Sequence, residues 1–457
     1  MIRDREFYKT IFRISLPAAF QALVSFLVVV ADDIMVSLMP NATIAQAAVS
    51  QVNSITAFYT ATVTGLVSGS AVLIAQYWGK KDMVRIRRIF SVVLWFCALV
   101  AVLFVAAAKL FPEAVVSIVI KGDETEVIEL ALSYFSIVCF SYLPFAVTTA
   151  LIGMLRSIEV VRITLVTTVM ALFVNIGLNY VLIFGKLGMP AMGVRGAAVA
   201  TLATRVVEML IVWVFTFSIQ KKLKIRPSDL LHIDRTLALD YGKYGLPVGL
   251  TDMQWAVIGM LKAAIIGQMG AAFMAANNIT TSMANLGTMF TFALAGGACV
   301  VVGKAVGKGD YDLARAYSKT IQIMFFVIGL VMAAVVFALK VPFTKLYGSS
   351  ADPEVFSLST QMISLLAITL IGTSYHASCF VGINRGAGDS RFVMIVDMIC
   401  GWLVVLPATL LAAFVFHAPL PIVFLCTRID QCFKWLIAFI RLRGNKWIRN
   451  VTREGEA

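Results

Sequence analysis

The chain alternates long apolar stretches with short polar segments along nearly its whole length. A helix needs about 20 apolar residues to cross the hydrocarbon core of a bilayer. On that scale the pattern predicts twelve transmembrane helices, and it excludes strands because no long alternation of apolar and polar positions occurs. The predicted spans are 12–38, 45–78, 89–112, 128–154, 162–184, 193–219, 241–269, 272–302, 317–340, 357–383, 392–415 and 418–440.

The composition also indicates an integral membrane protein. Hydrophobic residues make up 60% of the 457 residues and charged residues only 14%, whereas soluble proteins carry about 25% charged residues. The seven cysteines are scattered within apolar segments and form no CxxC motif, so neither a zinc site nor a disulfide framework is expected. The charged start of the chain runs into an apolar stretch too long for the core of a signal peptide, so no cleavable signal is expected.

The basic residues predict the orientation of the spans. With the N-terminus placed inside, 27 of the 38 Lys and Arg residues fall in inner segments and 6 in outer segments. Cytoplasmic loops are enriched in Lys and Arg, so we expect a multi-pass protein of the cell (plasma) membrane with both termini in the cytoplasm. The same distribution accounts for the net charge of +13 without a nucleic-acid partner.

Short motifs repeat at a nearly constant distance. The segment WGKKDMVRIRR, which starts at Trp78, matches VGKGDYDLARA, which starts at Val306, at an offset of 228 residues. The segment GMLRSIEVVR at 153–162 matches GINRGAGDSR at 382–391 at an offset of 229 residues. Because the offset covers six predicted helices, the halves are expected to be parallel repeats. Transporters of this design hold the substrate between the repeats and alternate access to it.

The repeat also predicts the domain organisation. We expect an N-terminal six-helix bundle at 1–220 and a C-terminal six-helix bundle at 241–457. The polar segment between them, 221–240, is expected to be a cytoplasmic linker.

Six further stretches are distinctive: LPAAFQALVSFLVVVADDIMVS, GSAVLIAQYWGKKD, NIGLNYVLIFG, MGVRGAAVAT, NRGAGDSR and RLRGNKWIR. Taken together, they resemble the multidrug and toxic compound extrusion (MATE) family over essentially the full length of the chain. The resemblance implies an all-α integral membrane protein with twelve transmembrane helices in two pseudo-symmetric six-helix bundles around a central cavity. It also implies export of organic cations and other amphipathic compounds in exchange for Na⁺ or H⁺.

Two adjacent carboxylates, Asp32 and Asp33, lie in the first predicted span, where a charge costs roughly 2.5–3.5 kcal/mol or more. Neighbouring helical residues point about 100° apart, so the two cannot face one cavity equally. By the resemblance, DDIMVS places Asp32 at the motif aspartate, the ion-coupling carboxylate of the N-terminal half. Asp33 then occupies a usually neutral position and is a candidate for the substrate cavity. Hydration at the outer interface is the alternative for both, and more so for Asp33.

Asn175 and Asn179 are four residues apart and therefore share one helix face. Amide oxygens can hydrogen-bond a protonated aspartate or help to ligate a cation. By the resemblance, Asn175, Asn179 and Thr201 match polar positions that join a network with the first-helix aspartate. Some relatives carry Asp where Asn179 stands, which leaves Asp32 with fewer ionisable neighbours here. Ordinary interhelical hydrogen bonding is the alternative.

The second half departs from the sodium-coupled branch of the family, which places acids on the seventh and tenth helices. Trp255 and Ser374 fall near those positions and cannot carry charge. The resemblance therefore implies a weaker C-terminal sodium site and shifts coupling toward Asp32.

Four residues of this half are candidates for the substrate cavity: Asp252, Trp255, Lys262 and Asp397. Lys262 falls near the repeat-equivalent of Asp32, which suggests an ion pair between the halves. A structural salt bridge or snorkelling would explain Lys262 more simply. Asp397 could either line the interior or form a structural pair.

Two further pairs, each within one helix, are expected to be structural. Asp430 and Lys434 are spaced i, i+4, and Arg205 and Glu208 are spaced i, i+3.

These patterns predict a secondary active transporter, not an enzyme. No P-loop motif occurs, and the three histidines, which are His232, His376 and His417, show no metal spacing. The expected partners are drug-like small molecules and the lipid bilayer, with H⁺ or Na⁺ as coupling cation, no other cofactor, and a monomeric chain.

Two alternative functions remain. A lipid-linked saccharide flippase of the same two-bundle architecture would need cavity arginines or lysines for a pyrophosphate, and only Lys262, Arg205 and Arg428 qualify, two of them with acids nearby in sequence. An intramembrane enzyme or scaffold would need a catalytic pair that the sequence does not supply.

Overall fold

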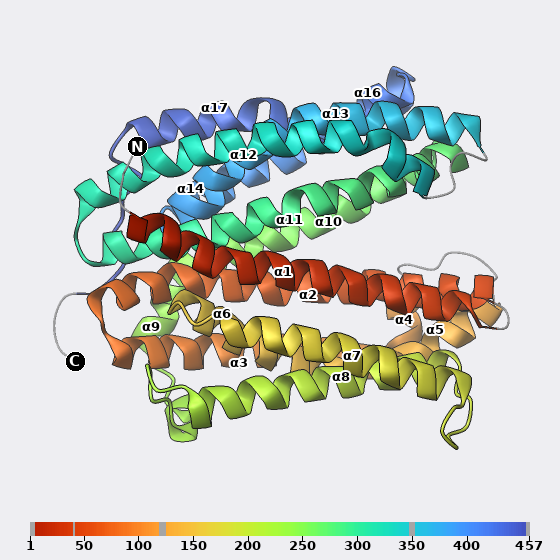
Figure 1. Cartoon of the computed structure of the whole chain (residues 1–457), viewed down its shortest axis with the longest axis horizontal. Helices are drawn as coiled ribbons and strands as arrows, with labels where there is room; N and C mark the ends of the chain where they lie inside the picture. The colour runs from red at the N-terminus through yellow and green to blue at the C-terminus, as the bar shows by residue number, and fades with distance from the viewer. Residues whose placement is uncertain (1–4, 40–41, 118–124, 347–351, 454–457) are drawn as a thin grey trace. The chain divides into compact units, whose positions relative to one another are not determined.

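The computed structural model describes residues 5–39, 42–117, 125–346 and 352–453, and every regular element in these ranges is helical. Within each of the two units described below, Figure 1 shows long helices that run side by side. The predicted all-α class is therefore confirmed.

Ten helices of the described ranges are long and apolar enough to cross a membrane. They match ten of the twelve predicted spans to within a few residues at most ends. Their bounds are Arg5–Ser37, Thr43–Lys80, Met83–Leu110, Thr125–Ser157, Arg162–Phe184, Val194–Ile219, Ala271–Gly307, Tyr311–Leu346, Pro353–Asn384 and Ser390–Val415.

The other two predicted spans are also helical, but they differ from the ten. Helix α10 (Leu246–Gly267) carries Asp252, Gln254 and Lys262 within 22 residues, which lowers its hydropathy. The predicted span 418–440 is interrupted, because α16 (Leu420–Cys426) ends before α17 (Asp430–Arg443) begins. The N–H groups of Arg428 and Ile429 bond to carbonyls three residues back, so the break is a tight turn of 3₁₀ type.

The chain divides into two compact units. The first contains Met1–Ala19, Ala71–Asp82 and Gly242–Ala457, and the second contains Phe20–Ser70 and Met83–Tyr241. Two long helices contribute to both units: α1 (Arg5–Ser37) gives its first turns to unit 1, and α2 (Ala42–Lys80) gives its last turns.

In unit 2, α8 is the helix around which α5, α6 and α7 pack, and α3 packs against α6. Figure 1 shows α7 and α8 side by side over their length. Stacked rings of Tyr59 and Tyr142, with centroids 4.3 Å apart, lie in the core, and the Tyr59 hydroxyl donates to the Tyr142 carbonyl. The helices that lie wholly in unit 2 are α3 (Met83–Leu110), α4 (Pro112–Ser117), α5 (Thr125–Val138), α6 (Tyr142–Ser157), α7 (Arg162–Phe184), α8 (Val194–Val214) and α9 (Arg235–Asp240).

The polar segment predicted as a linker docks on α3. The Leu230 carbonyl accepts hydrogen bonds from Ser91 and from the Trp95 indole, each at 2.8 Å. Asp234 caps α9 and pairs with Arg88 at 3.2 Å. Burial alone would raise the pKa of Asp234, but backbone N–H groups of α9 and the Arg88 guanidinium outweigh it and hold this pKa below its usual value. The segment is therefore ordered by its own polar contacts.

In unit 1, α13 is central: α11, α12 and α17 all pack against it, and α10 packs against α14. Figure 1 shows α12 running alongside α13. The π-helical turns Ser378–Asn384, Ile399–Val405 and Leu411–Val415 interrupt the α-helical pattern. The remaining helices of unit 1 are α11 (Ala271–Gly307), α12 (Tyr311–Leu346), α13 (Pro353–Ala377), α14 (Ser390–Met398) and α15 (Leu406–Leu410).

Two glycines at matching positions of the sequence repeat have the same structural role. A Cβ on Gly79 would strike the carbonyl oxygen of Lys304, and a Cβ on Gly307 would strike the carbonyl oxygen of Gln76. The end of α2 and the end of α11 therefore approach closely within unit 1 because neither glycine has a side chain.

The motifs NRGAGDSR and RLRGNKWIR meet in unit 1. Asp389 is fully buried and forms ion pairs with Arg441 at 2.8 Å and Arg449 at 3.2 Å. Burial raises the pKa of Asp389, and the two guanidinium groups counteract part of that rise. Gly388 has φ +85°, and a side chain there would meet the Arg449 carbonyl. These contacts hold the C-terminal segment against the turn before α14.

Large apolar side chains are exposed along the outer faces of several helices. On α3 these are Trp95, Leu99, Val102 and Leu103, whereas Ile89 and Val93 of the same helix are buried. An apolar exposed face together with an apolar buried face is typical of a helix surrounded by lipid. The chain is thus a multi-pass membrane protein.

Candidate functional site

A hydrogen-bonded chain of one carboxylate and two amides lies in unit 2. The Asn179 side-chain amide donates to Asp32 Oδ1 and also to Asn175 Oδ1, the latter at 3.2 Å. Asn175 and Asn179 are nearly fully buried on α7, and Asp32 on α1 is half-buried. The predicted i, i+4 face of α7 therefore meets the predicted carboxylate of α1.

The surroundings of this chain contain further polar groups. Arg205 on α8 lies within electrostatic range of Asp32 and forms the predicted ion pair with Glu208 at 2.7 Å. Thr201, one turn earlier on α8, donates to the Ala197 carbonyl at 3.0 Å and lies beside Tyr134 of α5. Thr201 thus lies close to the network but forms no direct hydrogen bond to Asp32 in the part of the chain that the structure describes.

Asp33 points differently from Asp32. It is exposed, and no described residue forms a hydrogen bond or an ion pair with it. The 100° separation of adjacent helical residues accounts for this difference. Asp33 belongs to unit 2, so it does not line the cavity of unit 1 described below.

The chemistry available to the Asp32 network is that of a small cation site. The carboxylate can take a proton or contribute oxygen ligands, and amide oxygens can add further ligands. Asn179 Oδ1 is buried and has no hydrogen-bond partner in the described part of the chain. This unsatisfied acceptor supplies one oxygen that a bound cation or a protonated group could use.

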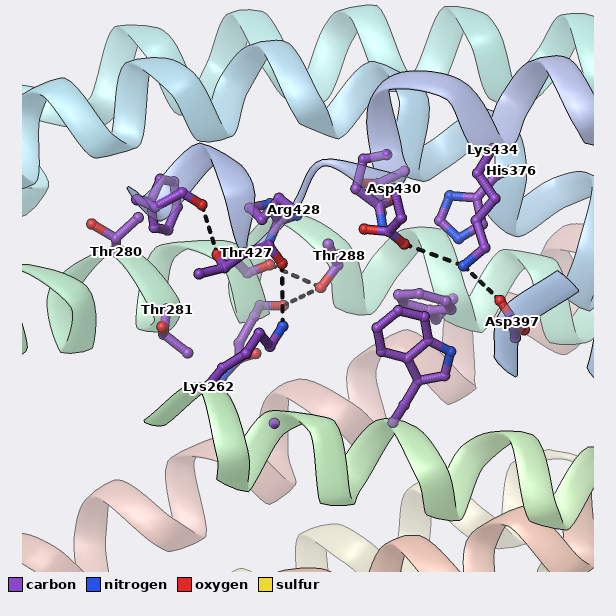
Figure 2. A pocket seen from close by; sticks show the side chains of 18 of the residues that line it. Lys262, Thr280, Thr281, Thr288, His376, Asp397, Thr427, Arg428, Asp430 and Lys434 are labelled. Atoms are coloured by element: carbon purple, nitrogen blue, oxygen red, sulfur yellow. Dashed lines mark hydrogen bonds and ion pairs between the residues drawn. The ribbon is translucent and has the colours of Figure 1, made fainter. Parts of the chain in front are cut away.

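A cavity of about 700 Å³ lies within unit 1 (Figure 2). Its walls come from α10, α11, α13 and the region of the break between α16 and α17. Four residues predicted for a substrate cavity line it: Asp252, Trp255, Lys262 and Asp397. Ser374 does not, because it is buried on α13 and shares a hydrogen bond with Thr291.

Lys434 is the centre of an ionic cluster in the cavity wall. Its ammonium lies 2.5 Å from Asp397 on α14 and 3.2 Å from Asp430 one turn away on α17. It also lies 4.6 Å from the centroid of the Trp255 ring. All three charged side chains are almost fully buried, so a desolvated lysine holds two carboxylates (Figure 2). The expected Asp430–Lys434 pair is present, and Asp397 both joins it and lines the cavity.

A second ion pair joins α10 to the turn after α13. Arg385, which is buried, donates from Nη2 to Asp252 Oδ1 at 2.8 Å. Lys262 has no such acid within the described ranges. It donates to the Thr427 carbonyl at 3.4 Å, and Arg428 beside Thr427 donates from Nε to Thr369 Oγ1 at 3.1 Å.

Sequence reasoning missed one wall of this cavity. Helix α11 faces it with amides and hydroxyls at helical spacing, a signal that was present within the apolar span 272–302. It also missed Arg385 as a cavity residue, because the turn after α13 cannot be placed without tertiary contacts. Arg428 was considered for a cavity only under the alternative flippase function, and it lines this one. The α11 residues are Asn277, Asn278, Thr280, Thr281, Asn285 and Thr288.

Comparison with known proteins matches this chain to one family. The MatE family model matches residues 17–181 and 247–430. The uncharacterized transporter YisQ of Bacillus subtilis is 23% identical over 428 residues, which cover 92% of this chain and 90% of YisQ. The probable multidrug resistance protein NorM of Halalkalibacterium halodurans is 27% identical over 361 residues, which cover 77% of this chain and 76% of that protein.

Solved structures show the same fold. An outward-facing multidrug resistance MATE family transporter of the MOP superfamily superposes with a TM-score of 0.84 at 21% identity, over 98% of this chain and 97% of that one. A crystal structure of MATE in complex with MaD3S gives a TM-score of 0.84 at 20% identity, over 95% of both chains.

Proposed function

Because this chain belongs to the MatE family of transporters, we propose that it is a secondary active multidrug exporter. It antiports amphipathic and cationic organic compounds against H⁺ or Na⁺ by alternating access. Membership of the family supports transport itself, and relatives named as probable multidrug resistance proteins support drug-like substrates. The proposed location is the cell membrane with both termini in the cytoplasm, which the excess of inner Lys and Arg supports.

The proposed coupling site is Asp32 with Asn175, Asn179 and Thr201. The single observation that carries it is the hydrogen bond from Asn179 to Asp32, which places a carboxylate of α1 against the buried amide face of α7. A carboxylate in a membrane span is a functional candidate by default, because the free-energy cost of burying its charge has to be offset. Taking up a proton or Na⁺ from outside neutralises Asp32, and discharge inside restores its charge.

The proposed halves are the repeats 1–220 and 241–457 joined by 221–240. The two matched segments of the family model, 17–181 and 247–430, support a duplicated architecture. Alternating access would then open the substrate site first to one side of the membrane and then to the other. Cavity residues such as those of unit 1 would hold the substrate.

Ethidium efflux from loaded proteoliposomes tests the proposal. An imposed proton gradient and an imposed sodium gradient are applied separately, to the wild type and to Asp32→Asn. We expect one gradient to drive efflux in the wild type, and we expect the loss of this response in folded Asp32→Asn. If neither gradient drives efflux by folded wild-type protein, antiport is wrong and the lipid-linked saccharide flippase becomes the leading function.

A further inference from the structure

Two cations of the unit 1 cavity have no carboxylate partner. Within the described residues, no Asp or Glu lies at ion-pair distance from Lys262 or Arg428, whereas Lys434 and Arg385 in the same cavity are both paired. The nearest acid in sequence, Asp430, is buried, and its Oδ2 accepts hydrogen bonds from Lys434 and Gln431. Four cationic side chains and three carboxylates thus line the cavity.

The two unpaired cations lie close together. Lys262 donates to the carbonyl of Thr427, the residue that precedes Arg428, and the charges of Lys262 and Arg428 interact electrostatically. Figure 2 shows Lys262, Thr427 and Arg428 at one end of the cavity and Lys434 with its two aspartates at the other. Like charges held near each other in a low-dielectric region repel, and an anion between them removes that repulsion.

Unused donors remain on both side chains. Lys262 has three donors and one weak contact to a carbonyl, and the terminal nitrogens of Arg428 have no partner among the residues described. A planar guanidinium beside an ammonium is well suited to bind a carboxylate or phosphate group. Trp255, Phe292 and Phe424 supply apolar surface for the rest of a ligand, and about 700 Å³ is the size of a drug-like binding site.

We propose that Lys262 and Arg428 form a binding site for the anionic oxygen group of a transported amphipath. This inference rests on the proposed export function, because it specifies the substrate class. The Lys434 cluster and the amide wall of α11 then face the remaining polar and cationic parts of the molecule.

Two dyes that differ in one group test the site. Rhodamine B carries a free carboxylate, and its ethyl ester has the same ring system without that negative charge. Their binding is measured by fluorescence polarisation to the full chain in phosphatidylcholine nanodiscs. We expect Lys262→Gln and Arg428→Gln each to weaken rhodamine B binding about tenfold or more, and to change binding of the ester little.

Two further variants control for folding and for charge. Lys262→Arg retains the charge and is expected to retain preference for rhodamine B over the ester. Lys340→Gln removes a cation of α12 that lies outside the cavity and bonds to Ser364, and it is expected to bind both dyes as the wild type does. Equal weakening of both dyes, or no weakening of either, overturns the inference.

Two further experiments identify the source of the anion and separate the anion-site proposal from the antiport proposal. If phosphatidylglycerol in the nanodisc abolishes wild-type rhodamine B binding, the site holds a lipid headgroup and the assignment to substrate is wrong. Gradient-driven efflux of the ester tests export independently. Efflux without Lys262-dependent binding overturns only the anion site, whereas Lys262-dependent binding without efflux overturns only the antiport proposal.

Discussion

The Asn179 amide donates a hydrogen bond to the Asp32 carboxylate and joins α7 to α1 within unit 2. Because the same amide nitrogen also donates to Asn175, the carboxylate is the end of a chain of polar groups that is buried on the α7 side. Asp33, one residue further on, is exposed and takes no part in that chain.

This difference predicts unequal effects of the two neutralising substitutions. Asp32→Asn is expected to abolish gradient-driven efflux, whereas Asp33→Asn is expected to retain most of it, because only Asp32 is bonded to the amide chain. Initial rates of ethidium efflux from proteoliposomes measure both. Equal loss in the two variants would contradict the separate roles assigned to them.

Removing the amide should weaken coupling without unfolding the protein. Asn179→Ala deletes a hydrogen bond to a charged group, which contributes roughly 1.5–3 kcal/mol, so the concentration of coupling cation for half-maximal efflux should change by about tenfold or more. In the background of Asp32→Asn the same substitution should add little, because the two groups act together. Additive losses would show that Asn179 acts independently of Asp32.

The Lys434 cluster should contribute strongly to stability. Lys434→Ala leaves Asp397 and Asp430 buried without a cation, and the loss of one partner of a buried pair costs about 3–5 kcal/mol. We therefore expect a clearly lower apparent Tm in detergent.

The matched control for Lys434→Ala is Arg315→Ala, which removes an ion pair whose Asp312 side chain is 94% exposed. It should cost about 1 kcal/mol or less. Comparable drops in Tm for the two variants would contradict the buried character of the Lys434 cluster.

The repeat-related glycines should tolerate no side chain. Gly79→Ala and Gly307→Ala each place a methyl group against a backbone carbonyl, which should lower stability by about 1–3 kcal/mol. Gly296→Ala on α11 has no atom within 4 Å of the added Cβ and should be neutral or stabilising by up to about 1 kcal/mol. The apparent Tm of the three variants is measured by thermal unfolding. A Tm that falls for Gly296→Ala alone would contradict the prediction.

The local pattern was sufficient for much of this protein. The length of each apolar stretch predicted ten spans to within a few residues at most ends, since a helix in lipid satisfies its own backbone hydrogen bonds and needs no tertiary partner to form. The i, i+4 spacing predicted the common face of Asn175 and Asn179 and the Asp430–Lys434 pair, because helical geometry alone determines which side chains are neighbours.

Contacts between helices decided the rest. Asp397 of α14 pairs with Lys434 of α17, and Arg385 pairs with Asp252, because elements far apart in sequence pack together. The same packing leaves Lys262 and Arg428 without an acid among the residues that the structure describes. The break of the last predicted span at Thr427–Ile429 also came from the structure. Arg428 and Asp430 mark the place in the sequence, but charged residues also lie within unbroken helices such as α10, so they did not by themselves predict a tight turn. The sequence by itself therefore determined that this chain is a helical membrane protein and that its first predicted span carries a carboxylate. Only the tertiary structure decided which charges are neutralised and which are left to a ligand, because ion pairing depends on distances that no spacing along the chain specifies.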